Sequence, residues 1–223
     1  MIDCIRQRGN ESMSLEELRE QNKRTVIEAA LACFIERGIE QTKISEIARR
    51  AKLTERSIYR YFETKADLVL AAALLFWDDN QQRIERAHAA SAPGKNGIAQ
   101  IYEILCAYAD LYFTNRQKII FVHEAEGYLN RNGKSALLDN KPPTPYEGSG
   151  APLANAIRAG IADGSVKTST NVELLYYNTY DALLGLLQKM AIMQDGSATS
   201  EIDARQRLTH FCALLTASFE QDF

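Results

Sequence analysis

Residues 42–62 of the chain read TKISEIARRAKLTERSIYRYF, which predicts two short helices joined by a tight turn. Apolar residues recur at helical spacing in both halves: Ile44, Ile47 and Ala48 in the first, and Ala51, Leu53, Ile58, Tyr61 and Phe62 in the second. Thr42 and Thr54 stand just before the two patterns, where a side-chain oxygen can cap the N–H groups of a first helical turn. A turn of about three residues makes the helices cross steeply, as in a helix-turn-helix that presents its second helix outward.

The outward positions of that second helix carry groups suited to DNA, namely Glu55, Arg56, Ser57, Tyr59 and Arg60. Arginine can donate two hydrogen bonds to guanine, glutamate can accept one from cytosine, and hydroxyl groups commonly bind phosphates. From Thr42 to Lys65 there are seven Lys or Arg and three Glu, so this stretch carries +4, whereas the whole chain carries −3. A positively charged stretch in a chain of negative net charge is typical of a surface that binds nucleic acid. The alternative is an ordinary helical hairpin with a solvated basic side.

These residues resemble the N-terminal domain of the tetracycline-repressor (TetR) family of transcriptional regulators. The resemblance spans about residues 25–70 and is carried by Gly38, Thr42, Lys43, Ile44, Ile47, Ala48, Ala51, Leu53, Thr54, the run from Ile58 to Phe62, and Lys65. It implies an all-α protein, with a three-helix helix-turn-helix domain at residues 15–70 and a helical ligand-binding and dimerisation domain at residues 71–223. We predict DNA contacts from Thr42, Lys43, Thr54, Glu55, Arg56, Ser57, Tyr59, Arg60, Tyr61 and Lys65.

Two positions depart from the family pattern. Lys52 stands in the turn where the family usually has glycine, which predicts a left-handed backbone at some steric cost. Glu55 and Arg56 stand where the family often has Lys-Gly at the start of the reading helix. We therefore do not expect this chain to prefer the same operator sequence as its relatives.

Composition sets the broad class of protein. In 223 residues, 46% hydrophobic content is ample for a buried core, which excludes disorder throughout. The longest apolar run, Val69 to Trp77, is nine residues, well short of the roughly 20 that cross a bilayer. No signal peptide is visible, and the four cysteines form no C-x-x-C pair, so we expect reduced thiols in a cytoplasmic protein, with a redox sensor as the alternative. No spacing indicates a metal site or a cofactor.

Helical spacing continues through the rest of the chain and predicts helices at 15–37, 64–90, 98–112, 118–130, 152–162, 172–193 and 201–220. Residues 1–14 lack periodicity and are predicted to form a flexible arm. The helix at 64–90 changes its apolar side partway, which indicates a mechanical link between two cores. Each of the last two helices carries a second apolar row, which predicts a homodimer through a four-helix interface.

Aromatic and polar residues crowd the C-terminal helices and are candidates for an effector pocket: Tyr108, Tyr112, Phe121, His123, Glu124, Tyr128, Tyr176 and Tyr180. An aromatic stripe of this kind equally suits a core. No nucleophile with an adjacent base and no phosphate loop can be identified, so an enzyme is not expected. We predict a ligand-responsive regulator, most simply a repressor released from a pseudo-palindromic operator by a small molecule. The alternative is an all-helical carrier or enzyme whose basic hairpin is incidental.

Overall fold

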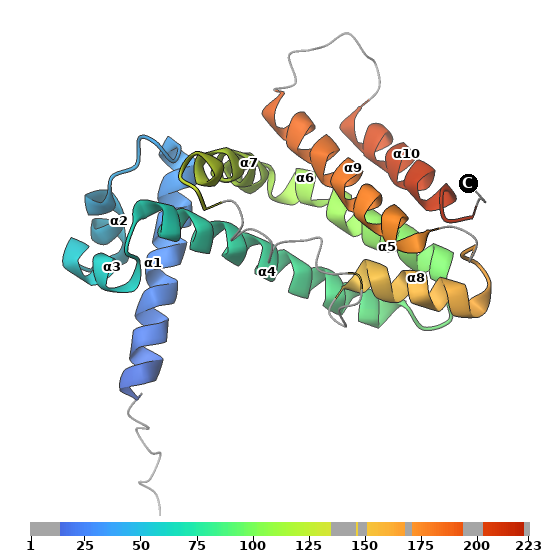
Figure 1. Ribbon diagram of the computed structural model, residues 1–223, viewed down its shortest axis with the longest axis horizontal. Coiled ribbons are helices and arrows are strands. Elements are labelled where there is room, and N and C mark those ends of the chain that lie inside the picture. Colours follow the sequence, from blue (N-terminus) through green and yellow to red (C-terminus); the bar gives the residue numbers. More distant parts are fainter. Residues whose placement is uncertain (1–13, 135–145, 147–150, 168–170, 194–202, 221–223) are drawn as a thin grey trace, which may run out of the picture.

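The computed structural model describes residues 14–134, 146, 151–167, 171–193 and 203–220, and this part of the chain is all-helical, as predicted. Its helices are α1 (Leu15–Arg37), α2 (Ile44–Ala51), α3 (Glu55–Tyr61), α4 (Lys65–Ser91), α5 (Gly97–Ala109), α6 (Leu111–Thr114), α7 (Arg116–Arg131), α8 (Pro152–Asp163), α9 (Val172–Ile192) and α10 (Ala204–Ala217). Figure 1 shows α1 to α3 in one lobe, α5 and α8 to α10 in another, and α4 running from the first to the second. Residues 1–13 of the predicted arm lie outside the described residues.

Helix α1 has the predicted bounds because both of its ends are capped. The Ser14 hydroxyl accepts a hydrogen bond from the Glu17 N–H (3.1 Å), and the Glu17 carboxylate accepts one from the Ser14 N–H (2.7 Å). At the other end Gly38 has φ 81°, which ends the helix, and its N–H bonds to the Phe34 carbonyl. The face bearing Val26 and Phe34 is buried and supports the helix-turn-helix.

The capping role predicted for Thr42 is wrong. Helix α2 begins after Lys43, whose N–H bonds to the Glu46 carboxylate at 3.0 Å. The Thr42 side chain is buried, and its hydroxyl donates to the carbonyls of Gly38 (2.8 Å) and Cys33 (3.2 Å). Thr42 therefore ties the loop before α2 to the end of α1.

Lys52 takes the left-handed conformation that the sequence predicts, with φ 55° and ψ 37°. It ends α2 in a paired arrangement of hydrogen bonds, in which the Lys52 N–H reaches the Arg49 carbonyl and the Leu53 N–H reaches the Ala48 carbonyl. The predicted cap at Thr54 is confirmed, since its hydroxyl accepts from the Ser57 N–H at 3.1 Å. The turn is thus defined at both of its ends.

A continuous apolar core joins the two lobes. Helix α4 starts with the predicted cap at Thr64, whose hydroxyl accepts from the Asp67 N–H, and it carries buried residues through both lobes. The rings of Phe34 on α1 and Phe121 on α7 stack at 5.8 Å with only 5° between their planes. The predicted division between residues 70 and 71 falls inside α4, so the two lobes are joined there by a continuous helix.

The second lobe is organised around the packing of α5 on α8. Gly97 and Gly160 lie so close that a Cβ atom added to Gly97 would stand 2.1 Å from the Gly160 Cα. The Asp163 carboxylate accepts from the Gly97 N–H (2.7 Å) and caps the start of α5. The prediction of one continuous helix at residues 98–112 is wrong. The helix ends before Asp110, and a separate short helix, α6, follows. Figure 1 shows α9 and α10 side by side on the outside of this lobe.

Candidate nucleic-acid interface and ligand cavity

Helix α3 projects a polar face from the first lobe. Its inner side is anchored by Ile58, which is buried against the core. Glu55, Arg56, Tyr59 and Arg60 are exposed, and Tyr59 retains 52% of its accessible surface. An exposed tyrosine among charged groups suits contacts with phosphates and bases. Four of the five outward positions predicted from the sequence therefore lie together on one accessible surface, and the fifth, Ser57, is half-buried.

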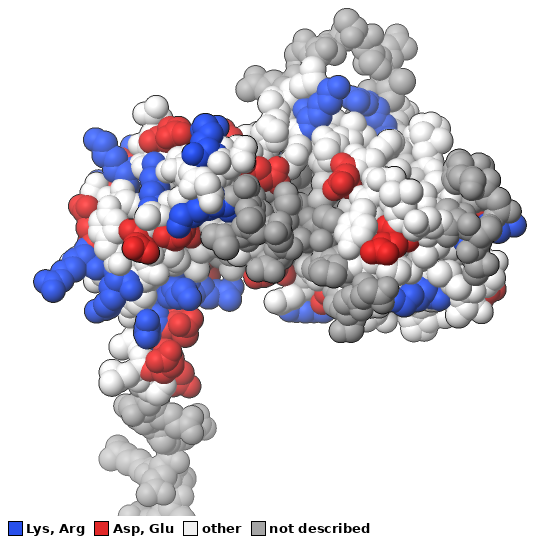
Figure 2. Space-filling view, in the orientation of Figure 1, with Lys and Arg blue, Asp and Glu red and all other residues white. Residues whose placement is uncertain are grey.

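Positive charge gathers on this lobe, as Figure 2 shows. Some of it is neutralised locally, since Arg37 pairs with Glu46 at 2.6 Å and Arg50 with Glu36 at 2.7 Å. The exposed basic residues Lys43, Arg49 and Arg56 make no ion pair within the residues that the structure describes. These three leave the helix-turn-helix with uncompensated positive charge, which attracts a phosphate backbone.

Lys65 turns toward the protein. Its ammonium group donates to the Glu40 carbonyl at 3.3 Å and lies 6.0 Å from the centre of the Tyr128 ring on α7. Burial lowers the pKa of Lys65, and the negative charge of Glu40 opposes that shift. A direct contact from Lys65 to DNA therefore requires its side chain to leave these partners.

Three further residues predicted to contact DNA, namely Thr42, Arg60 and Tyr61, interact with other groups of the protein. Thr42 is buried, so its side chain is not on the exposed face. Arg60 lies 5.1 Å from the centre of the Tyr61 ring and donates to the Tyr61 hydroxyl at 3.1 Å. That contact holds the Arg60 guanidinium along the surface of α3.

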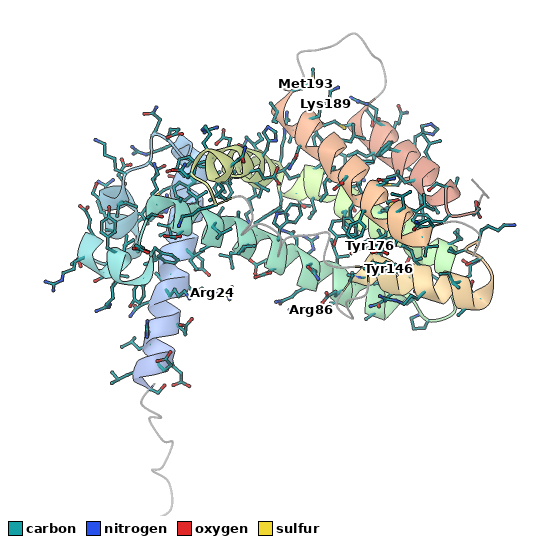
Figure 3. All side chains as sticks on the ribbon, viewed as in Figure 1. Arg24, Arg86, Tyr146, Tyr176, Lys189 and Met193 are labelled. Atoms are coloured by element: carbon teal, nitrogen blue, oxygen red, sulfur yellow. The ribbon has the colours of Figure 1, made fainter. Side chains whose placement is uncertain are left out.

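Three of the predicted pocket residues form a buried tyrosine cluster. The Tyr180 and Tyr108 hydroxyls are 3.0 Å apart, and the Tyr176 ring meets the Tyr180 ring at 5.1 Å. Burial raises the pKa of both Tyr108 and Tyr180. Figure 3 labels Tyr176 beside Tyr146, whose ring lies 5.4 Å away. The cluster packs α5 against α9 as part of the core.

The other five predicted pocket residues are dispersed. Phe121 stacks on Phe34, Tyr128 lies beside Lys65, and Tyr112 is buried on α6. His123 and Glu124 are exposed on α7. None of the eight lines either of the two cavities described below, and their role in ligand binding stays a prediction.

The first cavity lies between α4, α6, α7 and α9 and is narrow, with free space for about one water molecule. Its walls are formed by Phe76, Trp77, Leu111, Ile119, Val122, Leu184, Leu187 and Gln188. A second, more open cavity of about 270 Å³ lies between α4 and α5 and is lined by Ile84, Ala87, His88, Glu103, Ile104 and Ala107. Sequence reasoning missed both sets because they come from several helices. The one available signal was Trp77, the only tryptophan of the chain.

Two other classes of site are absent from the part of the chain that the structure describes. None of its helices is long and apolar enough to span a bilayer. Within the same residues, no three His, Cys, Asp or Glu side chains come together in a way that could hold a metal ion. The α3 surface and the cavities are candidate sites among the described residues.

Comparison with known proteins connects this geometry to a family. Residues 26–72 match the family described as bacterial regulatory proteins, tetR family, which confirms the resemblance seen in the sequence. The HTH-type transcriptional regulator HbdR of Aromatoleum sp. (strain CIB) is 26% identical over 163 residues, which are 71% of this chain and 66% of HbdR. This chain therefore spans just under two thirds of the length of HbdR.

Solved structures share the fold of this chain. A TetR-family transcriptional regulator from Mesorhizobium loti MAFF303099 superposes with a TM-score of 0.64 at 15% identity, covering 90% of this chain and 96% of that one. FadR from Bacillus subtilis, solved with stearoyl-CoA, superposes with a TM-score of 0.59 at 17% identity, covering 87% of this chain and 97% of that one. At these identities the comparison establishes a common fold.

Proposed function

We propose that this chain is a ligand-responsive transcriptional regulator which binds DNA through α3. The premise is that residues 26–72 place it in the TetR family of bacterial regulatory proteins. The single observation that carries the proposal is the outward face of α3. Glu55, Arg56 and Tyr59 are exposed on a capped helix whose inner side is anchored by Ile58. Exposed groups on a rigid helix can enter the major groove at little cost in entropy.

A homodimer would give this surface its specificity. One seven-residue helix makes few base contacts, whereas two copies about 34 Å apart read two half-sites of a pseudo-palindrome. The outer faces of α9 and α10 carry exposed apolar side chains, with Leu174 56% exposed and Leu214 55% exposed. Figure 3 labels Met193, another exposed apolar residue, at the end of α9. We propose that a second copy covers these faces.

Contacts between α7 and the first lobe support regulation by a small molecule. Besides the stack of Phe34 on Phe121, Arg131 pairs with Glu40 at 3.3 Å, and Lys134 pairs with Asp67 near the start of α4. A ligand that favours one placement of α4 and α7 changes the separation of the two α3 helices. Ligand and DNA then weaken the binding of each other by the same factor. We propose a cytoplasmic repressor that its ligand releases from DNA.

Selection from a random-sequence duplex library tests the proposal. The purified full chain is mixed with the library at roughly 150 mM salt, where attraction to phosphates alone is weakened, and bound DNA is sequenced. We expect enrichment of an inverted repeat with half-sites about one helical turn apart. A folded protein that enriches no sequence, with and without effector candidates, would contradict the proposal and favour a carrier.

The dimer is tested separately by sedimentation. Leu214→Glu places a charge in the proposed α10 interface and is expected to yield monomers that bind the selected DNA weakly. Leu18→Glu is the matched control, because Leu18 is also exposed, at 44%, but lies on α1. Equal sedimentation of the two variants would contradict an interface at Leu214.

A further inference from the structure

Two cysteines from distant parts of the chain meet where α10 packs on α5. Cys106 lies on α5 and Cys212 on α10, and their thiols share a hydrogen bond. Just after α5, Asp110 pairs with Arg205 of α10 at 3.5 Å, so a second contact holds the two helices in this alignment. Cys33, the remaining cysteine among the described residues, is buried on α1 in the first lobe. Cys106 and Cys212 are therefore the one thiol pair in the part of the chain that the structure describes.

The two thiols differ in their access to solvent. Cys106 is partly exposed, whereas Cys212 is fully buried, with 0% of its surface accessible. A small reagent in solution therefore reaches Cys106 first. The Tyr102 hydroxyl is a second hydrogen-bond partner of the Cys106 sulfur. Cysteines that respond to oxidants are typically accessible thiols placed beside a second cysteine that resolves them, and this pair has both properties.

The surroundings of Cys106 favour its thiolate, which is the reactive form of cysteine. The hydrogen bond from Cys212 lowers the pKa of Cys106 most, and the one from Tyr102 adds to this effect, while burial, Asp110 and Glu103 oppose it. The balance brings the pKa of Cys106 to about 7. The same hydrogen bond, together with burial, raises the pKa of Cys212. At neutral pH the accessible sulfur is thus partly thiolate, and the buried sulfur keeps its proton.

A hydroperoxide is the class of oxidant that suits this arrangement. The Cys106 thiolate attacks one peroxide oxygen, so that an S–O bond forms and the O–O bond breaks. The leaving alkoxide takes up a proton and departs as an alcohol, or as water when the oxidant is hydrogen peroxide. The sulfur has then lost two electrons to the peroxide and is a sulfenic acid.

Cys212 is placed to complete the reaction. Its sulfur attacks the Cys106 sulfur, an S–S bond forms, the S–O bond breaks, and the hydroxyl group leaves with the Cys212 proton as water. Cys212 can give up this proton because its hydrogen bond with the Cys106 thiolate, the largest cause of its raised pKa, no longer exists at that stage. The two thiols and one hydroperoxide thus yield one disulfide, one alcohol and one water.

We infer that Cys106 is a modification site for hydroperoxides, and that Cys212 closes the oxidised site into a disulfide which joins α5 to α10. The inference goes beyond the proposed function, which concerns reversible binding of DNA and of a ligand. Disulfides in a cytoplasm are usually transient and redox-sensing, since cellular thiols reduce them again. While the disulfide persists, it holds α10 covalently to α5, and α10 carries Leu214 of the proposed dimer interface.

Peptide mapping of the natural full chain tests the inference. The reduced chain, freed of reductant, is treated near neutral pH with an equimolar amount of hydrogen peroxide. The remaining thiols are blocked with iodoacetamide, and mass spectrometry without reduction identifies the linked peptides. We expect the Cys106 peptide joined to the Cys212 peptide, and both thiols restored by dithiothreitol. Oxidation that leaves these two cysteines unlinked, or that links Cys106 to Cys4 or Cys33, would overturn the inference.

Two serine variants isolate the role of the buried thiol. In Cys212→Ser, oxidation of Cys106 is expected to stop at the sulfenic acid, which dimedone traps as an adduct. Cys33→Ser is the matched control, because Cys33 is also a buried cysteine, at 5% exposure, and this variant should form the disulfide as the natural chain does. Circular dichroism checks that both variants are folded. Equal dimedone labelling of Cys106 in the two variants would contradict the resolving role of Cys212.

A third variant tests the order of the two steps. In Cys106→Ser the accessible thiolate is gone, so we expect hydrogen peroxide to oxidise Cys212 at least about tenfold more slowly than in the natural chain. The rate is followed as loss of the iodoacetamide-labelled Cys212 peptide. An unchanged rate would make Cys212 the first target of the oxidant and overturn the assignment of Cys106.

Discussion

Lys65 and Glu40 are joined by a hydrogen bond, in which the Lys65 ammonium donates to the Glu40 carbonyl at 3.3 Å. The bond links the first turn of α4 to the loop between α1 and α2. Glu40 also pairs through its carboxylate with Arg131 at the end of α7, and the Tyr128 ring of α7 faces Lys65. Lys65, which the sequence predicts to contact DNA, thus also lies where the two lobes meet.

Replacing Lys65 with alanine is expected to weaken DNA binding for all sequences alike. One lost phosphate contact reduces the slope of log affinity against log salt concentration by about 0.9. Arg131→Ala is the control, because it removes a positive charge that the structure pairs with Glu40 on the α7 side. Salt titrations with operator and random duplexes measure the slope for the natural chain and for each variant. Equal slopes for the natural chain and for Lys65→Ala would exclude a contact between Lys65 and a phosphate.

Replacing Arg56 with alanine is expected to relax sequence preference at one base pair of each half-site. The Arg56 guanidinium is exposed near the start of α3, where it can form a bidentate contact with guanine worth about 1–3 kcal/mol of discrimination. Competition among operators that differ at single positions measures the effect. A uniform loss across all positions would instead assign Arg56 to the phosphate backbone.

Replacing Lys52 with glycine is expected to stabilise the protein by about 1 kcal/mol. Among the described residues other than glycine, only Lys52 has a positive φ, and a Cβ atom is unfavourable in that conformation. Lys52→Ala is the control, because it removes the charge and keeps the Cβ atom. Urea unfolding gives both values, and equal gains from the two substitutions would attribute the effect to charge.

Replacing Gly97 with alanine is expected to destabilise the protein by about 3 kcal/mol or more. The added Cβ atom would lie 2.1 Å from the backbone of Gly160, so α5 and α8 would have to separate. Gly127→Ala is the control, because its Cβ atom would meet only the end of the Arg131 side chain at 3.4 Å. That substitution removes a helical glycine and is expected to stabilise by up to about 1 kcal/mol.

Cys106 is expected to react with iodoacetamide as a thiol of low pKa. A hydrogen bond with Cys212 and one with Tyr102 stabilise the Cys106 thiolate against the cost of burial, and its pKa falls to about 7. The thiol is therefore about half deprotonated near pH 7, so the alkylation rate should rise through pH 7. Cys212→Ala should move that midpoint upward, toward the ordinary value for a cysteine. Mass spectrometry of the Cys106 peptide follows the rate, and an unchanged midpoint in the variant would contradict the role of Cys212.

Local rules were sufficient for much of the fold. The bounds of α1, the caps at Thr54 and Thr64 and the left-handed Lys52 all follow from residue type and spacing within a few positions. Thr42 shows where such rules fail. Its hydroxyl could cap α2 by position, yet carbonyls brought close by the end of α1 take it as a donor instead.

By itself, the sequence determined the all-α class, the helix-turn-helix and the outward face of α3, because helical periodicity places each side chain relative to its own axis. Only the tertiary structure decided where helices from distant parts of the chain leave space between them. It buried Tyr108, Tyr176 and Tyr180 in the core and placed Trp77 at the wall of a cavity. A cavity depends on how several helices cross, and that geometry is not encoded in the spacing along any one of them.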